Sequence, residues 1–110
     1  MIEDTLSKLE TRLRGLPTLP DEKKAELTGL FAKLREEVEK LPGTRADDAE
    51  SIASFAALSA HEATRAGGNP ELRDLSLEGL ATSVEDFEAS HPRLVQVVNS
   101  ICTSLANLGI

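Results

Sequence analysis

The sequence predicts an all-α fold, a coiled-coil-like bundle of about five helices built from helical hairpins. Leu and Ala supply 30 of the 44 hydrophobic residues, whereas Val and Ile supply only nine, and strands favour the β-branched and aromatic side chains that are scarce here. Apolar residues recur at spacings of three and four, as they do on one face of a helix. Pro and Gly residues interrupt this pattern at four places. We therefore expect a single helical domain over residues 1–110.

The first two helices are expected to form an N-terminal hairpin over residues 1–41. The first helix should cover residues 2–16, because its apolar residues follow a 4-3-4-3 spacing: Ile2, Leu6, Leu9, Leu13 and Leu16. Pro17 and Pro20 end it and leave a short connection, which favours antiparallel neighbours. The second helix, capped by Thr18, should extend to residue 41 along another apolar stripe: Leu27, Leu30, Phe31, Leu34, Val38 and Leu41.

The acidic region over residues 46–110 should contain the remaining helices. A third helix is expected to run on an alanine-rich face to about residue 66, where residues 67–70 (GGNP) stop it. A fourth helix should cover residues 71–89, with Gly79 as an internal weak point of about 1 kcal/mol relative to Ala. Its expected apolar stripe consists of Leu72, Leu75, Leu77, Leu80, Val84 and Phe87.

The chain must bend at His91 and Pro92 before the last helix, expected over residues 92–108. No charged residue follows Arg93 in this helix, and Gly109 is its expected C-cap. Apolar residues cover more than half of its circumference, a width that requires more than one neighbouring surface. The helix is therefore expected either at the centre of the bundle or at an oligomer interface, formed by Leu94, Val98, Ile101, Leu105 and Leu108.

The charge of the chain disfavours two classes of partner. Its formal net charge is -7, from 12 Lys and Arg against 19 Asp and Glu, whereas nucleic acids and anionic membranes attract a clustered positive field. Residues 1–45 carry nine basic and nine acidic side chains, but residues 46–110 carry three basic and ten acidic ones. This asymmetry indicates either that the two parts attract each other, the simpler interpretation, or that an acidic face is left for a partner.

The single cysteine and the N-terminus favour a cytoplasmic location. Cys102 alone can form neither an intramolecular disulfide nor a thiol metal cluster within one chain, which suits a reducing compartment. The N-terminus begins with acidic residues instead of the basic and apolar run of a signal peptide. No apolar run approaches the roughly 18 residues of a membrane span. We expect no membrane contact.

The C-terminal part of the chain resembles a known family. The segment FEASHP at residues 87–92, followed by a Leu- and Val-rich helix that ends in LANLGI at residues 105–110, is similar to the C-terminal signature of a small bacterial family, domain of unknown function 4404. The layout of the hairpin from Thr5 to Leu41 is similar too. The resemblance implies a helical, bacterial, cytoplasmic protein, and it implies no activity, ligand or catalytic residue.

Two histidines lie in patterns that also occur at functional sites. His61 and Glu62 begin like the HExxH helix of a zinc protease, but Arg65 stands where the second histidine ligand is needed. His61 is therefore expected to be a partly exposed helix residue. His91 lies near Glu88 and could sense pH, but its expected role is to fix the bend together with the proline that follows it.

The other candidate residues also favour structural roles. Asp47, Asp48 and Glu50 lack the spacing of a calcium loop and suit the positive end of a helix dipole. The acids between residues 85 and 88 are expected to form a solvated face. Cys102 is expected to behave as a small hydrophobic residue instead of a nucleophile. The Gly-Gly-Asn segment lacks the Lys-Ser/Thr of a phosphate loop.

No acid, base and nucleophile occur together, so the sequence predicts no catalytic residue, no cofactor and no metal site. The leading interpretation is a non-catalytic cytoplasmic helical protein that acts through self-association, with a dimer favoured, or through docking on another protein. The alternative is a helical bundle that binds a small ligand or a metal between its helices.

Overall fold

The computed structural model describes residues 2–17 and 19–108, and it confirms the all-α prediction. The regular structure of these residues consists of five α-helices and two short 3-10 helices, with no strand among them. In chain order these are α1 (Ile2–Arg14), α2 (Asp21–Glu39), η1 (Gly43–Arg45), α3 (Ala46–Thr64), α4 (Pro70–Ser83), η2 (Glu85–Phe87) and α5 (Pro92–Ala106).

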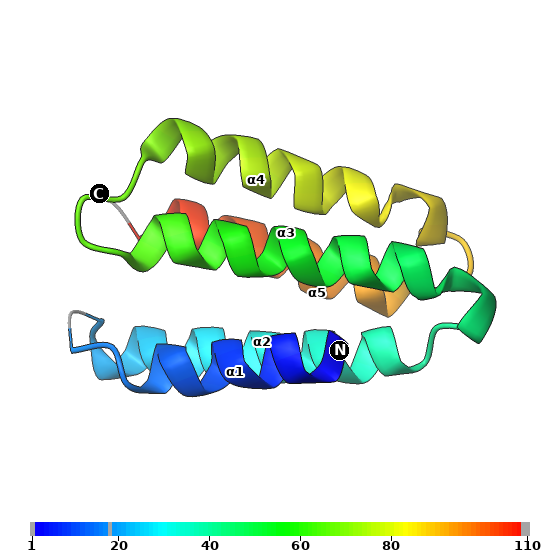
Figure 1. The fold of residues 1–110 in the computed structure, drawn as a ribbon, viewed down its shortest axis with the longest axis horizontal. Coiled ribbons are helices and arrows are strands. Elements are labelled where there is room, and N and C mark those ends of the chain that lie inside the picture. Colours follow the sequence, from blue (N-terminus) through cyan, green and yellow to red (C-terminus); the bar gives the residue numbers. More distant parts are fainter. Residues whose placement is uncertain (1, 18, 109–110) are drawn as a thin grey trace.

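The helices lie along one another, and each reverses the direction of the helix before it (Figure 1). Contacts join them in a closed order, from α1 to α2, α5, α4, α3 and back to α1, and α3 also touches α5. The Cα radius of gyration is 13.0 Å, close to the value of about 13 Å for a compact chain of 100 residues. Each helix therefore has two neighbours that can cover its apolar stripe.

The hairpin of α1 and α2 buries the leucines that its heptad-like spacing places on one side. Leu6, Leu9 and Leu13 of α1 are buried. They lie in one core with the apolar stripe of α2, which consists of Leu27, Phe31, Leu34 and Val38. Because burial of apolar area contributes roughly 25 cal/mol per Å², this stripe stabilises both helices and their antiparallel pairing.

Alanines let α3 lie close to its neighbours. Ala49, Ala53, Ala56 and Ala60 are buried along one face, and α3 contacts α1, α4 and α5. The chain turns after α3 through Gly67, whose φ of 70° is in the left-handed region that favours glycine. The alanine-rich face therefore buries little area per residue but allows α3 to contact three other helices.

The predicted course of the fourth helix is wrong at its C-terminal end. Residues 71–89 were expected to be helical, but α4 ends at Ser83 and the tighter η2 follows. Val84 and Phe87 are both buried, as their helical spacing from Leu77 and Leu80 predicts. The guanidinium of Arg45 lies 4.4 Å from the centroid of the Phe87 ring, a cation–π contact that no local sequence signal reveals.

The predicted apolar stripe of the fourth helix is wrong at its start. Leu72 and Leu75 are 43% and 57% exposed. The face of α4 that the core covers instead contains Ser76, Leu77 and Leu80. The Oγ of Ser76 donates to the carbonyl oxygen of Arg73, which satisfies the buried hydroxyl within its own helix.

The helix ends differ from the predicted caps. Thr18 and Gly109, the expected caps of the second and last helices, lie outside the described residues. Pro20 occupies the N-cap position of α2 without a side-chain capping bond. Asn69 does cap α4, since its Oδ1 accepts from the backbone N–H groups of residues 71 and 72 at 2.9 and 3.1 Å.

Candidate functional site

A groove follows the surface between α3 and α4, and we call it the α3–α4 groove. Two adjoining hollows form it, and they share Ser51 and Phe55. The first hollow lies between the two helices and is lined by Asp48, Ser51 and Phe55 of α3 and by Leu75, Glu78, Gly79, Thr82, Ser83 and Asp86 of α4 and η2. The second hollow extends the groove over α3 and is lined by residues of that helix alone: Asp47, Glu50, Ser51, Ser54, Phe55 and Leu58. The two helices are antiparallel, so the beginning of α3 lies at the same end of the groove as the end of α4 (Figure 1).

Apolar side chains lie exposed along this groove. Leu58, Leu72 and Leu75 are the exposed large hydrophobic residues among the described residues, and all three belong to α3 or α4. Phe55 is partly buried in the middle of the groove, where α4 presents Gly79 to its ring. Scattered exposed leucines are ordinary on a protein surface, but a concentration on one face is typical of an interaction surface.

The charged side chains that line the groove are all acidic. Five carboxylates lie along it, those of Asp47, Asp48, Glu50, Glu78 and Asp86, and no Lys, Arg or His is among its lining residues. Only the Asp48 carboxylate forms an ion pair within the described part of the chain. The groove therefore combines apolar side chains with lining charges of one sign, and Arg45 pairs with one of these carboxylates, that of Asp48.

The local sequence explains why the acids gather there. Asp47 and Asp48 occupy the first turn of α3, where free N–H groups and the helix dipole stabilise negative charge. Arg45 lies just before α3, and its Nε donates a hydrogen bond to the Asp48 carboxylate at 2.6 Å. Asp86 lies in η2 at the same end of the groove (Figure 1). Helix-start electrostatics therefore account for Asp47 and Asp48, whereas Glu50, Glu78 and Asp86 are exposed acids on the surfaces of their helices.

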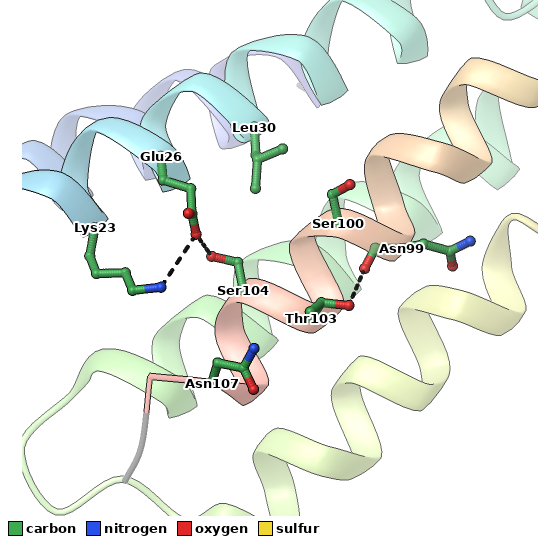
Figure 2. A pocket seen from close by; sticks show the side chains of 8 residues that line it. All are labelled: Lys23, Glu26, Leu30, Asn99, Ser100, Thr103, Ser104 and Asn107. Carbon is green, nitrogen blue, oxygen red and sulfur yellow. Dashed lines mark hydrogen bonds and ion pairs between the residues drawn. The ribbon is translucent and has the colours of Figure 1, made fainter.

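A second groove lies between α2 and α5 and is mostly polar (Figure 2). Glu26 reaches from α2 to α5, where the hydroxyl of Ser104 donates to its carboxylate, and Lys23 lies 3.6 Å from the same carboxylate oxygen. The hydrogen bond from Ser104 is the main cause that lowers the pKa of Glu26. The contact between Glu26 and Ser104 joins α2 to α5, so a role in helix packing accounts for the polar side chains at this position.

A small apolar pocket lies where α1, α2 and α3 meet. Its volume is about 160 Å³, and it is lined by Leu6, Arg35, Val38, Glu39, Leu41, Pro42, Gly43, Ala46 and Ala49. Pockets for drug-sized ligands measure about 300–1,000 Å³. This pocket offers space for only a few apolar atoms, and the described residues contain no group of three or more His, Cys, Asp or Glu side chains placed to hold a metal.

The two histidines lie far apart in the fold. Arg12 Nη2 of α1 lies 2.9 Å from Nδ1 of His61, so the histidine links α1 to α3. The ring of His91 stands edge-on to Phe87, with centroids 5.7 Å apart, and its backbone N–H donates to the carbonyl oxygen of Phe87 at 2.7 Å. His91 takes the N-cap position of α5, directly before Pro92. Both histidines therefore make contacts that hold helices together.

The lone cysteine is partly buried against α4. Cys102 Sγ lies 3.7 Å from the carbonyl oxygen of Leu77, and burial raises the pKa of its thiol. A raised pKa lowers the fraction of reactive thiolate at neutral pH. These surroundings favour the interpretation of Cys102 as a small hydrophobic residue.

The residues expected at an oligomer interface lie inside the chain. Leu94, Val98, Ile101 and Leu105 are each 0% exposed, because α5 packs on α2, α3 and α4. Leu108 is partly buried against the same core. The last helix was expected either at the centre of the bundle or at an oligomer interface. In the structure it lies at the centre of the bundle, where these four side chains are not accessible to a second copy.

The groove was not predicted from the sequence, because Leu72 and Leu75 were expected to lie in the core. One signal was present, since the lower net charge of residues 46–110 already indicated an acidic face. The structural role of Glu62 was not predicted either. Glu62 is buried, and its carboxylate accepts hydrogen bonds from Arg65 Nε at 2.9 Å and from the Asn69 backbone N–H at 3.1 Å. These bonds lower the pKa of the Glu62 carboxyl group. No rule of residue spacing predicts a carboxylate that accepts hydrogen bonds from the connection between α3 and α4.

Comparisons with known proteins place the chain in one family. No curated protein and no solved structure gives a significant match. A family model described as "Domain of unknown function (DUF4404)" matches residues 29–110, from the middle of α2 onward, and includes the FEASHP segment and the whole α3–α4 groove. None of the described helices combines the length and apolarity that crossing a membrane requires. The match covers most of the chain and confirms the resemblance, so the protein belongs to the DUF4404 family.

Proposed function

We propose that this protein acts without catalysis, as a protein-interaction module whose docking surface is the α3–α4 groove. The observation that carries the proposal is the coincidence of exposed apolar side chains and unpaired carboxylates on one face. Protein interfaces place apolar side chains at their centre and polar groups at their rim. Leu58 and Leu75 are both exposed. Leu75 lines the hollow between α3 and α4, Leu58 lines the adjoining hollow on α3, and Phe55 lines both.

The exposed leucines support a binding role more strongly than a folding role. A leucine that is about half exposed contributes little to stability compared with one in the core, so stability alone gives little reason for Leu58 and Leu75 to line one groove. The side chains of the bundle core, by contrast, are enclosed by the chain itself. Docking of another protein is therefore the part of the expectation that we favour, ahead of self-association through the last helix.

The proposal includes a location in the bacterial cytoplasm. It is supported by the single, partly buried cysteine, which suits a reducing compartment, and by the family resemblance.

The proposal is tested by affinity capture from a bacterial lysate with the wild-type chain and the double variant Leu58→Gln, Leu75→Gln. Both positions are exposed, so the variant should keep its melting temperature within a few degrees. The matched control is Ala25→Gln, Ala106→Gln, which adds the same side chains at exposed positions of α2 and α5. We expect the wild type and the control to capture the same protein and the double variant to lose it. Equal capture by all three chains would contradict the assignment of the groove.

A further inference from the structure

The groove also indicates the chemistry of the partner, and this inference rests on the proposed function. We propose that the α3–α4 groove binds a short amphipathic helix rich in Lys and Arg. Such a helix would lay its apolar side chains on Phe55, Leu58 and Leu75 and direct its basic side chains to the carboxylates that line the groove.

The dimensions of the groove suit a helix of about three turns. Its lining residues on α3 run from Asp47 to Leu58, a distance of roughly 16 Å at 1.5 Å per residue. The apolar residues Phe55 and Leu58 are one turn apart on α3, and Leu72 and Leu75 are one turn apart on α4. A ligand helix with apolar residues at i, i+3 or i+4, and i+7 can follow this pattern.

The groove is polarised along its length. Because α3 and α4 are antiparallel (Figure 1), Asp47, Asp48 and Asp86 lie at the end of the groove where α3 begins and α4 ends, whereas Leu58 and Leu75 lie nearer the other end. A partner helix should therefore carry its basic residues toward one end and its largest apolar residues toward the other. This polarity gives the bound helix a preferred direction, because reversing it would place apolar side chains on the carboxylates.

A second copy of this chain fits the groove less well. The exposed large hydrophobic side chains of the described residues, those of Leu58, Leu72 and Leu75, all belong to α3 and α4, so no other described helix offers such a side chain to the groove of a second copy. A symmetric pairing of groove on groove would then bring two rows of carboxylates together, and like charges in one interface oppose association. Opposite charge on the partner removes this penalty.

Fluorescence anisotropy with three labelled synthetic peptides tests the inference on the intact protein. The first is a 16-residue helix-forming peptide with Leu at i, i+3, i+4 and i+7 and with Lys elsewhere on its flanks. The second replaces every Lys by Glu, and the third is a scrambled sequence of the first. We expect saturable binding of the first peptide only, weakened about tenfold between low and high salt because the charges are screened.

Protein variants separate the apolar contribution from the charge contribution. Two double variants are compared: one combines Leu58→Gln with Leu75→Gln, and the other combines Glu50→Gln with Glu78→Gln. Each should weaken binding of the basic peptide by about tenfold, which corresponds to about 1.4 kcal/mol. The matched control Glu22→Gln, Glu36→Gln removes the same charge from exposed positions of α2 and should leave the affinity within about twofold of the wild type, since these sites lie outside the groove.

Three results would overturn the inference. Equal binding of the Lys and Glu peptides would remove the charge argument, and equal weakening by the groove and control variants would show unspecific attraction to an acidic protein. A wild-type dimer in sedimentation that Leu58→Gln, Leu75→Gln dissociates would identify a second copy as the occupant. If the groove variant loses a captured protein but no basic peptide binds, the proposed function stands and the partner chemistry is wrong; if neither capture nor peptide binding depends on the groove, both are wrong.

Discussion

Gly79 of α4 lies directly beneath the ring of Phe55 of α3. A Cβ atom at position 79 would be 2.6 Å from Phe55 Cδ1 and 2.8 Å from Phe55 Cζ, closer than carbon atoms pack. The glycine, which the sequence presents as a weak point in a helix, thus allows α3 and α4 to approach each other and seats the ring in the floor of the groove.

The first prediction concerns this pair. Gly79→Ala should displace the Phe55 ring and should fail to give the stabilisation of about 1 kcal/mol that the helix propensity of alanine provides elsewhere. In a Phe55→Ala background the same substitution should stabilise the protein by about that amount, because the clash is absent. Urea denaturation of the four chains of this double-mutant cycle measures the coupling. Equal effects of Gly79→Ala in both backgrounds would contradict the contact.

The second prediction concerns pH and the α3–α4 connection. The Arg65 side chain and the Asn69 backbone N–H lower the pKa of Glu62 from its ordinary value of 4.5. A carboxylate with a lowered pKa in the folded state stabilises the protein above its unfolded pKa, and this contribution disappears as pH falls below about 4.5 toward the folded pKa. Glu62→Gln should therefore lower the melting temperature at pH 7 and make progressively less difference below pH 4.5.

Calorimetric melting of the wild type and Glu62→Gln between pH 3 and 7 measures this difference. The control is Glu71→Gln, an exposed acid at the start of α4. A constant difference in melting temperature across the whole range would show that the Glu62 carboxylate does not titrate as the structure implies.

The third prediction concerns the buried face of α5. Ile101→Ala should reduce the free energy of unfolding by about 2–5 kcal/mol, since it removes a fully buried side chain. Ile101→Asp should unfold the chain, because its charge would be buried without a partner. Asn99→Asp, an exposed change on the same helix, should be within about 0.5 kcal/mol of the wild type. Circular dichroism during denaturation reports all three.

The opposite result for Ile101 would be informative. A folded, monomeric Ile101→Asp variant derived from a dimeric wild type would show that this side chain lies between two copies instead of inside one.

The fourth prediction concerns the bend before α5. His91→Gln should cost about 0.5–1.5 kcal/mol of stability through loss of the edge-on contact with Phe87. Pro92→Ala should cost about 0.4–1 kcal/mol, because alanine gives the unfolded chain more freedom. Neither change touches the groove, so peptide binding should persist. Loss of binding in His91→Gln at an unchanged melting temperature would make His91 a binding residue.

Local signals in the sequence were enough to predict the helical class and the places where the chain turns. The leucines of α1 and α2 repeat with the period of a helix, and Pro17, Pro20 and Pro92 act on the backbone beside them. These are local effects, so they can be derived from a stretch of a few residues. The end of α4 at Ser83 was predicted wrongly because no Gly or Pro marks it, although the burial of Val84 and Phe87 agrees with their spacing.

Which apolar faces are covered depends on how the helices pack against one another. The stripes of α4 and α5 are both wide, yet α5 is enclosed by three helices while Leu72 and Leu75 of α4 stay exposed. Spacing shows that a residue lies on a helical face, but it does not show how many neighbours that face meets. The groove forms because the antiparallel helices α3 and α4 bring Leu58 and Leu75 to one surface. Such an arrangement cannot be derived from local spacing, since burial depends on contacts between residues that are distant in the chain.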